Sequence, residues 1–213
     1  MNNIEDINYM LSLYCPGECL NCNIWKEDKE EVTKDELSTD LFDTVIKSNS
    51  LSKTNYFDLT AGESQLSPKY VNTIKSIVKY HPNAFIHTNI SGWYPQKHYD
   101  VTKEALQYIN KENMRIDISL DGTEEYYGKV RLVKNGYQKA LKTIEKLKPL
   151  GITLRLVIVL HKETYKDLLN VIELANQLEI GYYIGYPRYS PKYFKSTSKE
   201  NYFSESQINE IEN

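Results

Sequence analysis

The chain is organised around the stretch Cys15-Pro16-Gly17-Glu18-Cys19-Leu20-Asn21-Cys22, which holds all three of its cysteines. The spacing Cys-x3-Cys-x2-Cys lets one loop present three thiolates to a single inorganic centre. Cysteine thiolates are the ligands of iron–sulfur clusters, which usually take four of them. Because the chain has only three cysteines, one iron would stay open to a ligand that the protein does not supply. The stretch therefore predicts a cluster site with one open position.

A zinc site is the alternative interpretation of the same cysteines. Structural zinc almost always takes four protein ligands, commonly in two separated pairs. One of four histidines would have to complete such a site, and none follows the cysteines at close spacing; they are His81, His87, His98 and His161. We prefer the cluster interpretation. His87 lies within a predicted strand and is expected to be a core histidine rather than a ligand.

Length and composition favour one intracellular domain. The 213 residues suit a single domain over 1–213 without a linker. Net charge is −3 with basic and acidic residues interspersed, so no basic stripe predicts a nucleic-acid partner. The first residues are polar and the longest apolar run, 156–160, is too short to span a bilayer. Clustered cysteines in odd number favour a reducing compartment, so we expect a cytoplasmic protein without a membrane partner.

Predicted strands alternate with predicted helices along the chain. Strands are expected over 7–14, 56–60, 84–89, 114–120, 152–160 and 180–186. A first helix is expected to begin at Thr33, where Glu36 completes a capping box, and a second at Pro68. Four more helices are expected over 102–109, 136–147, 166–178 and 205–211.

This alternation predicts an α/β fold with parallel strands joined by right-handed crossovers. Six units fit a partial (β/α)6 TIM-like barrel better than a closed eightfold barrel, which takes about 250 residues. A flat doubly wound sheet is the alternative. In both architectures, functional residues gather at the carboxyl ends of the strands. The unusual residues of this chain fall there, in the cysteine loop, Gly62-Glu63, Asn89, Ser119 to Asp121, and Tyr186.

These residues resemble the radical S-adenosylmethionine (SAM) enzymes over about 7–186. Cys15-x3-Cys19-x2-Cys22 is similar to that family's cluster motif. Three later segments follow in the family's order: Thr60-Ala61-Gly62-Glu63-Ser64, Thr88-Asn89-Ile90-Ser91-Gly92, and Ile118-Ser119-Leu120-Asp121-Gly122 with Arg131. The last one looks especially like the branch that holds MoaA and the peptide maturases. That branch carries a cysteine-rich C-terminal extension in its larger members, and no cysteine follows Cys22 here, so a single cluster is expected.

The resemblance implies a [4Fe-4S] cluster held by Cys15, Cys19 and Cys22, with SAM bound at the open iron. Reductive cleavage of SAM would give a 5′-deoxyadenosyl radical that abstracts hydrogen from a substrate. Gly62 and Glu63 would lie at the amino end of SAM, and Ser119 and Arg131 at its carboxylate or ribose. The full set of residues expected to bind SAM is Gly62, Glu63, Ser64, Asn89, Ser119, Asp121, Arg131 and Tyr186. No catalytic residue is identified.

Some positions depart from the family pattern. Asn21 precedes the last cysteine, where the family usually has an aromatic residue. Ala61 replaces the first glycine, and Ser64 the proline, of the second motif.

Simpler structural roles stay open for several of these residues. Gly62-Glu63 could form only a strand-to-helix turn, and Asn89 could cap a turn. Ser119 and Asp121 could begin a helix. Most of the eighteen tyrosines are expected to be ordinary strand residues. At the end of the last strand, Tyr186 and Arg188 are the best candidates to line a pocket.

Two kinds of partner are expected. One is a small electron donor such as a flavodoxin or ferredoxin. The other is a substrate, either a small molecule or a peptide, and a large substrate or a second subunit would fill the open side of the barrel. The alternative function is a non-catalytic iron–sulfur or metal-binding protein that retains the fold.

Overall fold

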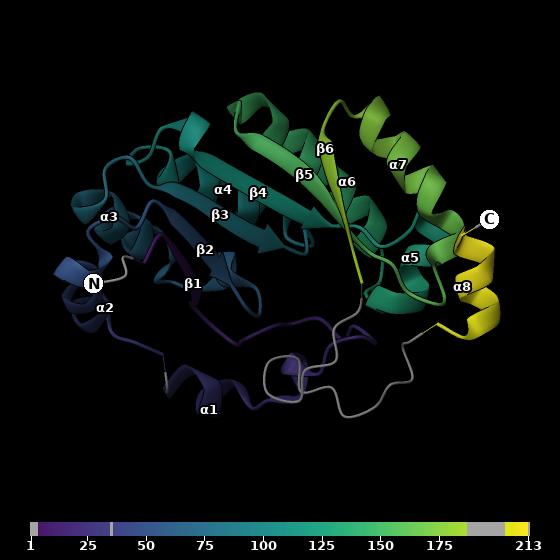
Figure 1. Ribbon diagram of the computed structural model, residues 1–213, viewed down its shortest axis with the longest axis horizontal. Helices are drawn as coiled ribbons and strands as arrows, with labels where there is room; N and C mark the ends of the chain where they lie inside the picture. Colours follow the sequence, from purple (N-terminus) through teal and green to yellow (C-terminus); the bar gives the residue numbers. More distant parts are fainter. Residues whose placement is uncertain (1–3, 35, 187–202, 213) are drawn as a thin grey trace.

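The computed structural model describes residues 4–34, 36–186 and 203–212. Its centre is one sheet of six parallel strands in the order of the sequence (Figure 1). The strands are β1 (Asp6–Met10), β2 (Tyr56–Thr60), β3 (Phe85–Ile90), β4 (Met114–Ser119), β5 (Thr153–Val159) and β6 (Gly181–Gly185). A doubly wound sheet reverses its strand order at a switch point. The sequential order therefore confirms the partial (β/α)6 barrel and excludes the flat alternative.

Eight α-helices are described, and most of them cover the outer face of the curved sheet (Figure 1). They are α1 (Lys29–Lys34), α2 (Thr39–Ile46), α3 (Tyr70–Tyr80), α4 (Pro95–Ala105), α5 (Glu124–Arg131), α6 (Gly136–Leu147), α7 (Leu168–Gln177) and α8 (Glu205–Glu212). Among the described residues, no helix combines the length and apolar character that crossing a membrane requires.

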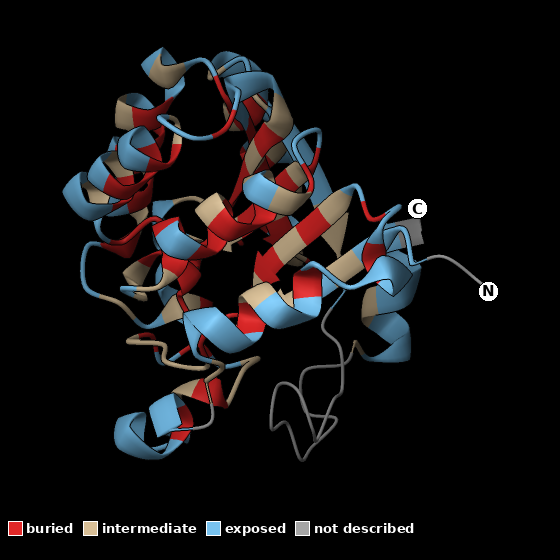
Figure 2. Cartoon of the chain, turned by 90° about the vertical axis from the view of Figure 1, so that its left-hand side faces the viewer, coloured by how far each residue is buried: buried red, intermediate tan, exposed pale blue. Residues whose placement is uncertain are grey.

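The core lies between the sheet and its helices, as the buried residues in Figure 2 show. On β4, Ile116 and Ile118 are completely buried, and on α6 so is Leu147. Burying one such side chain contributes about 1.5–3 kcal/mol. Side chains alternate between the two faces of a strand. Because one face of the sheet packs on the helices, every other side chain points to the inside of the barrel. The inward residues are largely polar, and they form the site described below.

Four details differ from the prediction. The helix expected at Thr33 was wrong: Thr33 lies inside α1, and α2 begins after Ser38, whose hydroxyl accepts a hydrogen bond from Leu41 N–H. The helix expected over 102–109 begins earlier, because Pro95 fits the first helical turn. Helix α5 was not predicted, since its hydrophobic pattern is weak and only two of its residues are buried. The second helix, expected from Pro68, begins at Tyr70.

Gly62 allows the start of the cysteine loop to lie in close contact with the end of β2. A Cβ atom at Gly62 would collide with the backbone carbonyl of Tyr14, the residue before Cys15. The next residue, Glu63, donates its N–H to the Tyr14 carbonyl oxygen over 2.8 Å. Ala61 turns the chain into this contact with a φ of 82°, a left-handed conformation that is uncommon outside glycine. The absence of a side chain at position 62 therefore sets where the loop begins.

We predict that Gly62→Ala destabilises the cluster-free protein by about 1–3 kcal/mol, because the methyl group must displace backbone. Urea unfolding under reducing, anaerobic conditions measures the effect. Gly128→Ala is the matched control, since a Cβ at Gly128 meets no atom within 4 Å. In helix α5 that change should be neutral or stabilising by about 0.5–1 kcal/mol. Equal stability of the two variants would contradict the proposed contact.

Candidate functional site

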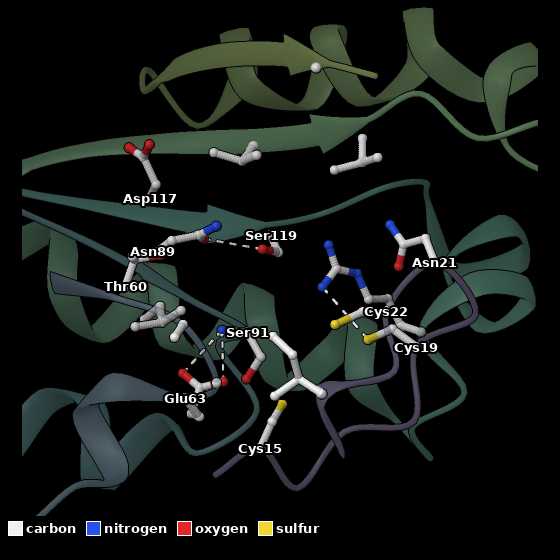
Figure 3. Close-up of a pocket in the computed structure, with 18 of the residues that line it drawn as sticks. Cys15, Cys19, Asn21, Cys22, Thr60, Glu63, Asn89, Ser91, Asp117 and Ser119 are labelled. Carbon is white, nitrogen blue, oxygen red and sulfur yellow. Dashed lines mark hydrogen bonds between the residues drawn. The ribbon is translucent and has the colours of Figure 1, made fainter. Parts of the chain in front are cut away.

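A cavity of about 660 Å³ lies on the inner side of the sheet, where the cysteine loop crosses the carboxyl ends of the strands. Figure 3 shows thiols, a carboxylate and strand-end polar groups around it. Nine residues that the sequence nominated line this one cavity: Cys15, Cys19, Cys22, Gly62, Glu63, Asn89, Ser119, Arg131 and Tyr186. Segments from across the chain therefore meet at the predicted edge of the sheet.

The cysteine loop is held by three kinds of contact. Cys22 N–H donates to the Cys19 carbonyl over 3.2 Å, which closes a tight turn between the last two cysteines. Leu20 N–H donates to the Val130 carbonyl over 2.9 Å and ties this turn to α5. Gly17 lies against the ring of Trp93, so closely that a Cβ there would collide with it. The loop is thereby fixed without using any of its thiols.

All three thiols are partly or fully buried and form no disulfide. Burial raises the pKa of Cys15 to about 12. Burial also raises the pKa of Cys19 and of Cys22, and Arg131 opposes the effect at both. Without a compensating cation, these thiols stay protonated. A metal centre supplies the charge that a thiolate needs, so the donor set fits a thiolate-bound cluster.

In the described part of the chain, no three His, Cys, Asp or Glu side chains are grouped as ligands of a single metal ion. The three thiols border the cavity from different points of the loop. In an iron–sulfur cluster the thiolates bind separate irons.

Arg131 lies beneath the loop as a largely buried cation. Its Nε donates to Asp121 Oδ2 over 2.6 Å, and its Nη1 lies 3.8 Å from Cys19 Sγ. The other carboxylate oxygen of Asp121 accepts the backbone N–H of Val159 over 2.7 Å. Asp121 is completely shielded and does not line the cavity. In the structure it orients Arg131, and its expected contact with SAM stays a prediction.

Glu63 presents a buried carboxylate to the cavity. Both of its oxygens accept the backbone N–H of Ser91, over 3.0 and 3.2 Å. Burial raises the pKa of Glu63 to about 7, although the hydrogen bonds from Ser91 pull it down. His98 Nε2 lies 3.9 Å away and is buried without a hydrogen-bond partner in the described residues. Burial lowers the pKa of His98 to about 3, so its imidazole is neutral and does not balance a charge on Glu63.

Of the remaining nominated residues, Asn89, Ser119 and Tyr186 line the cavity and Ser64 does not. Ser119 Oγ donates to Asn89 Oδ1 over 3.1 Å, so the ends of β3 and β4 are coupled within the cavity. Tyr186 is exposed at its rim. Ser64 is buried, donates its hydroxyl to the Thr60 carbonyl over 2.9 Å and does not line the cavity. Arg188 lies outside the described residues.

The sequence interpretation missed a second group of cavity residues, which lie deeper in the barrel. Asp58, Asp117 and Arg155 occupy inward positions on β2, β4 and β5. A charged residue inside an otherwise apolar strand is the signal that could have found them, since charges are almost never buried unpaired. His87 belongs with them: it is half-buried, lines the cavity and pairs with two carboxylates. The expected core position was therefore wrong, whereas the expectation that His87 is no metal ligand stays a prediction.

The chain matches the model of the Radical SAM superfamily over residues 9–175. That range covers most of the chain, and the protein belongs to the radical SAM superfamily. No curated protein matches the chain.

Solved structures share the fold at low identity. SuiB from Streptococcus suis, solved with S-adenosylmethionine, is 12% identical with a TM-score of 0.70, over 99% of this chain and 46% of SuiB. The enzyme anSMEcpe, solved with AdoMet and the Cp18Cys peptide, is 14% identical with a TM-score of 0.71, over 97% of this chain and 57% of its own. Methylornithine synthase (PylB) is 12% identical with a TM-score of 0.62, over 97% of this chain and 60% of its own. The chain thus spans about half the length of these proteins.

We predict that Glu63→Gln raises the free energy of unfolding above that of the unchanged protein, and that this difference grows as the pH rises. The folded pKa of about 7 lies above the ordinary value of 4.5, so the folded state holds its proton more tightly. The unchanged protein therefore loses stability between pH 4.5 and 7 and stays penalised above that range, by about 3 kcal/mol in full. Glutamine carries no such penalty.

Urea unfolding of the cluster-free protein at pH 5 and pH 8 measures this difference. The exposed Glu104→Gln is the control, and it should change stability by less than about 0.5 kcal/mol at either pH. A Glu63→Gln effect of equal size at both pH values would contradict the raised pKa.

Proposed function

We propose that this chain is a radical SAM core domain over 1–213 whose cysteine triad holds one [4Fe-4S] cluster beside a SAM site. The observation that carries the proposal is that one cavity joins the three thiols to Glu63, Ser119 and Arg131. Family membership makes a SAM-dependent radical reaction the expected chemistry of such a cavity. When bound, the cluster would deliver the electron that cleaves SAM to methionine and a 5′-deoxyadenosyl radical, which abstracts hydrogen from the substrate.

The protein's own groups support that role by binding and orienting. Glu63 offers two carboxylate oxygens at one end of the cavity, suited to an ammonium group such as the SAM amine. Arg131 offers a buried cation next to Cys19, held in place by Asp121. Ser119 and Asn89 add hydrogen-bonding groups between these ends. Buried donors and acceptors of this kind cost no reorganisation when a ligand arrives.

One wall of the cavity is packed closely enough to keep water from that side. Trp93 is 4% exposed and covers Gly17 of the loop, and its ring nitrogen donates to the Tyr127 hydroxyl. Thr143 on α6 donates its hydroxyl to the Gly92 carbonyl over 2.7 Å, which fixes the segment that carries Trp93. Water exclusion prevents side reactions of reactive intermediates, and this packed wall would provide it.

We further propose a small electron donor such as a flavodoxin or ferredoxin as partner. It would dock at the loop, where Glu18 and Leu20 are exposed. The substrate is a small molecule or a peptide; SuiB has been solved with its precursor peptide SuiA, and that likeness supports the peptide. We place the protein in the cytoplasm, because three free thiols need a reducing compartment.

Substitution of each cysteine tests the cluster and the reaction together. We predict that Cys15→Ser, Cys19→Ser and Cys22→Ser each lose iron and sulfide on anaerobic reconstitution. Each should also lose the 5′-deoxyadenosine that the unchanged protein forms from SAM with dithionite. Leu20→Ser, in the same loop, exposed and outside the cavity lining, is the matched control and should keep both.

Two results would contradict the proposal. Cluster assembly without any 5′-deoxyadenosine would favour a non-catalytic iron–sulfur protein. Stoichiometric zinc in anaerobically purified protein would argue against the cluster itself.

A further inference from the structure

The interior of the barrel below the cysteine loop is charged. Closed barrels of this kind are filled by layers of Val, Ile and Leu. Here the inward positions of four neighbouring strands carry what we call the charge ladder: Asp58 on β2, His87 on β3, Arg115 and Asp117 on β4, and Arg155 on β5. In the strand register Asp58 pairs with His87, and Asp117 with Arg155. The ladder therefore runs across the sheet rather than along one strand.

Short ion pairs connect the members of the ladder. His87 Nδ1 lies 2.9 Å from Asp58 Oδ1, and His87 Nε2 lies 2.9 Å from Asp117 Oδ2. Arg155 donates two hydrogen bonds to the same Asp117, from Nε to Oδ1 over 3.1 Å and from Nη2 to Oδ2 over 2.5 Å. Asp117 is thus a fully buried acceptor shared by an imidazole and a guanidinium group.

The charges of the ladder do not cancel when His87 is protonated. Burial lowers the pKa of His87, but hydrogen bonds to Asp117 and Asp58 more than compensate, and the pKa lies above its ordinary value. Arg115 Nε lies 3.4 Å from Asp117 Oδ1. Two carboxylates then face two guanidinium groups and one imidazolium, which leaves one positive charge in excess. With His87 protonated, an anion bound at the ladder balances that charge.

Arg155 is the ladder residue with a donor group left to bind an anion. Asp117 occupies its Nε and Nη2, while Nη1 has no partner among the described residues. Its guanidinium group also lies 5.0 Å from the centre of the Tyr183 ring, which restrains its orientation. Both Arg155 and Tyr183 line the cavity. Arg155 therefore presents a fixed donor edge, the geometry with which arginine binds carboxylates.

The ladder and the cysteine triad lie at different parts of the cavity. Figure 3 shows Asp117 well away from Cys19 and Cys22, with Asn89 and Ser119 between them. A molecule held at the ladder would consequently extend toward the cofactor end. Arg131, the cation at that end, already has its own carboxylate in Asp121.

We propose that the charge ladder is the substrate end of the cavity and that Arg155 binds a carboxylate group of the substrate. A carboxylate suits the remaining donor edge of Arg155, because one guanidinium edge can donate to both oxygens of a carboxylate. This inference rests on the proposed function, because it is the SAM-dependent reaction that requires a substrate at this end. It assigns the substrate class, a carboxylate-bearing molecule, and a specificity residue.

Two matched probes test the proposal by titration calorimetry. N-acetylglycine carries a carboxylate, and N-acetylglycinamide is its neutral analogue of nearly the same size. The reconstituted protein is saturated with SAM, and reductant is left out so that SAM stays intact. We expect the carboxylate to bind about tenfold more tightly or better, since a hydrogen bond to a charged group contributes about 1.5–3 kcal/mol.

Two variants assign the preference to Arg155. Arg155→Met should abolish it, while His87 and Arg115 still neutralise Asp117. Arg155→Lys keeps the charge but not the planar set of donors. The difference in binding free energy between the two probes should fall to less than half of its value in the unchanged protein. Equal binding of the two probes to the unchanged protein would overturn the proposal, and so would a full preference in both variants.

A separate readout distinguishes this failure from failure of the proposed function. The same preparations are assayed for 5′-deoxyadenosine after dithionite is added. If the unchanged protein cleaves SAM but binds both probes equally, the assignment of Arg155 is wrong and the proposed function stands. If it cleaves no SAM yet shows an Arg155-dependent preference, the carboxylate site stands and the proposed function fails.

Discussion

The site depends on the close contact between Gly62 and the backbone of Tyr14. Without a side chain at position 62, the end of β2 can lie against the first residues of the cysteine loop, and the Glu63 N–H closes the contact. The same turn places the Glu63 carboxylate against the Ser91 N–H at the end of β3. One backbone contact thus fixes a thiol-bearing loop and a buried carboxylate at neighbouring strand ends.

The cavity contains two buried ion-pair systems with different roles. Asp121 and Arg131 form a pair beside Cys19, at the end of the cavity that we propose for the cofactor. The charge ladder is a larger network in which Asp117 is shared by several cations. Its spare donor edge on Arg155 distinguishes it from a network that only supports the fold. Buried ion pairs stabilise a fold weakly once desolvation is counted, and the proposed ligand-binding role would explain why this barrel holds them.

The sequence predicted the sheet well, because strand patterns are local, and it placed the three cysteines at the cavity that the structure shows. Strand β2 and helix α6 have the predicted bounds, and the motif residues fall at strand ends that parallel topology brings together. Helix α5 escaped prediction because it is stabilised by tertiary contacts rather than by an amphipathic pattern. The ladder was not predicted because its partners are distant in sequence: only the folded structure shows that the His87 ring contacts both Asp58 and Asp117. The contact of Ser91 with Glu63 was not predicted because it is made by the backbone N–H, which every residue but proline carries.

The proposed function requires that three thiolates leave one iron open for SAM. Electron paramagnetic resonance of the reduced, reconstituted protein tests it directly, with spectra recorded with and without SAM. We predict the signal of one reduced [4Fe-4S] cluster per chain, and a clear change in that signal when SAM is added. A cluster signal that SAM leaves unchanged would contradict the open coordination position and the function built on it.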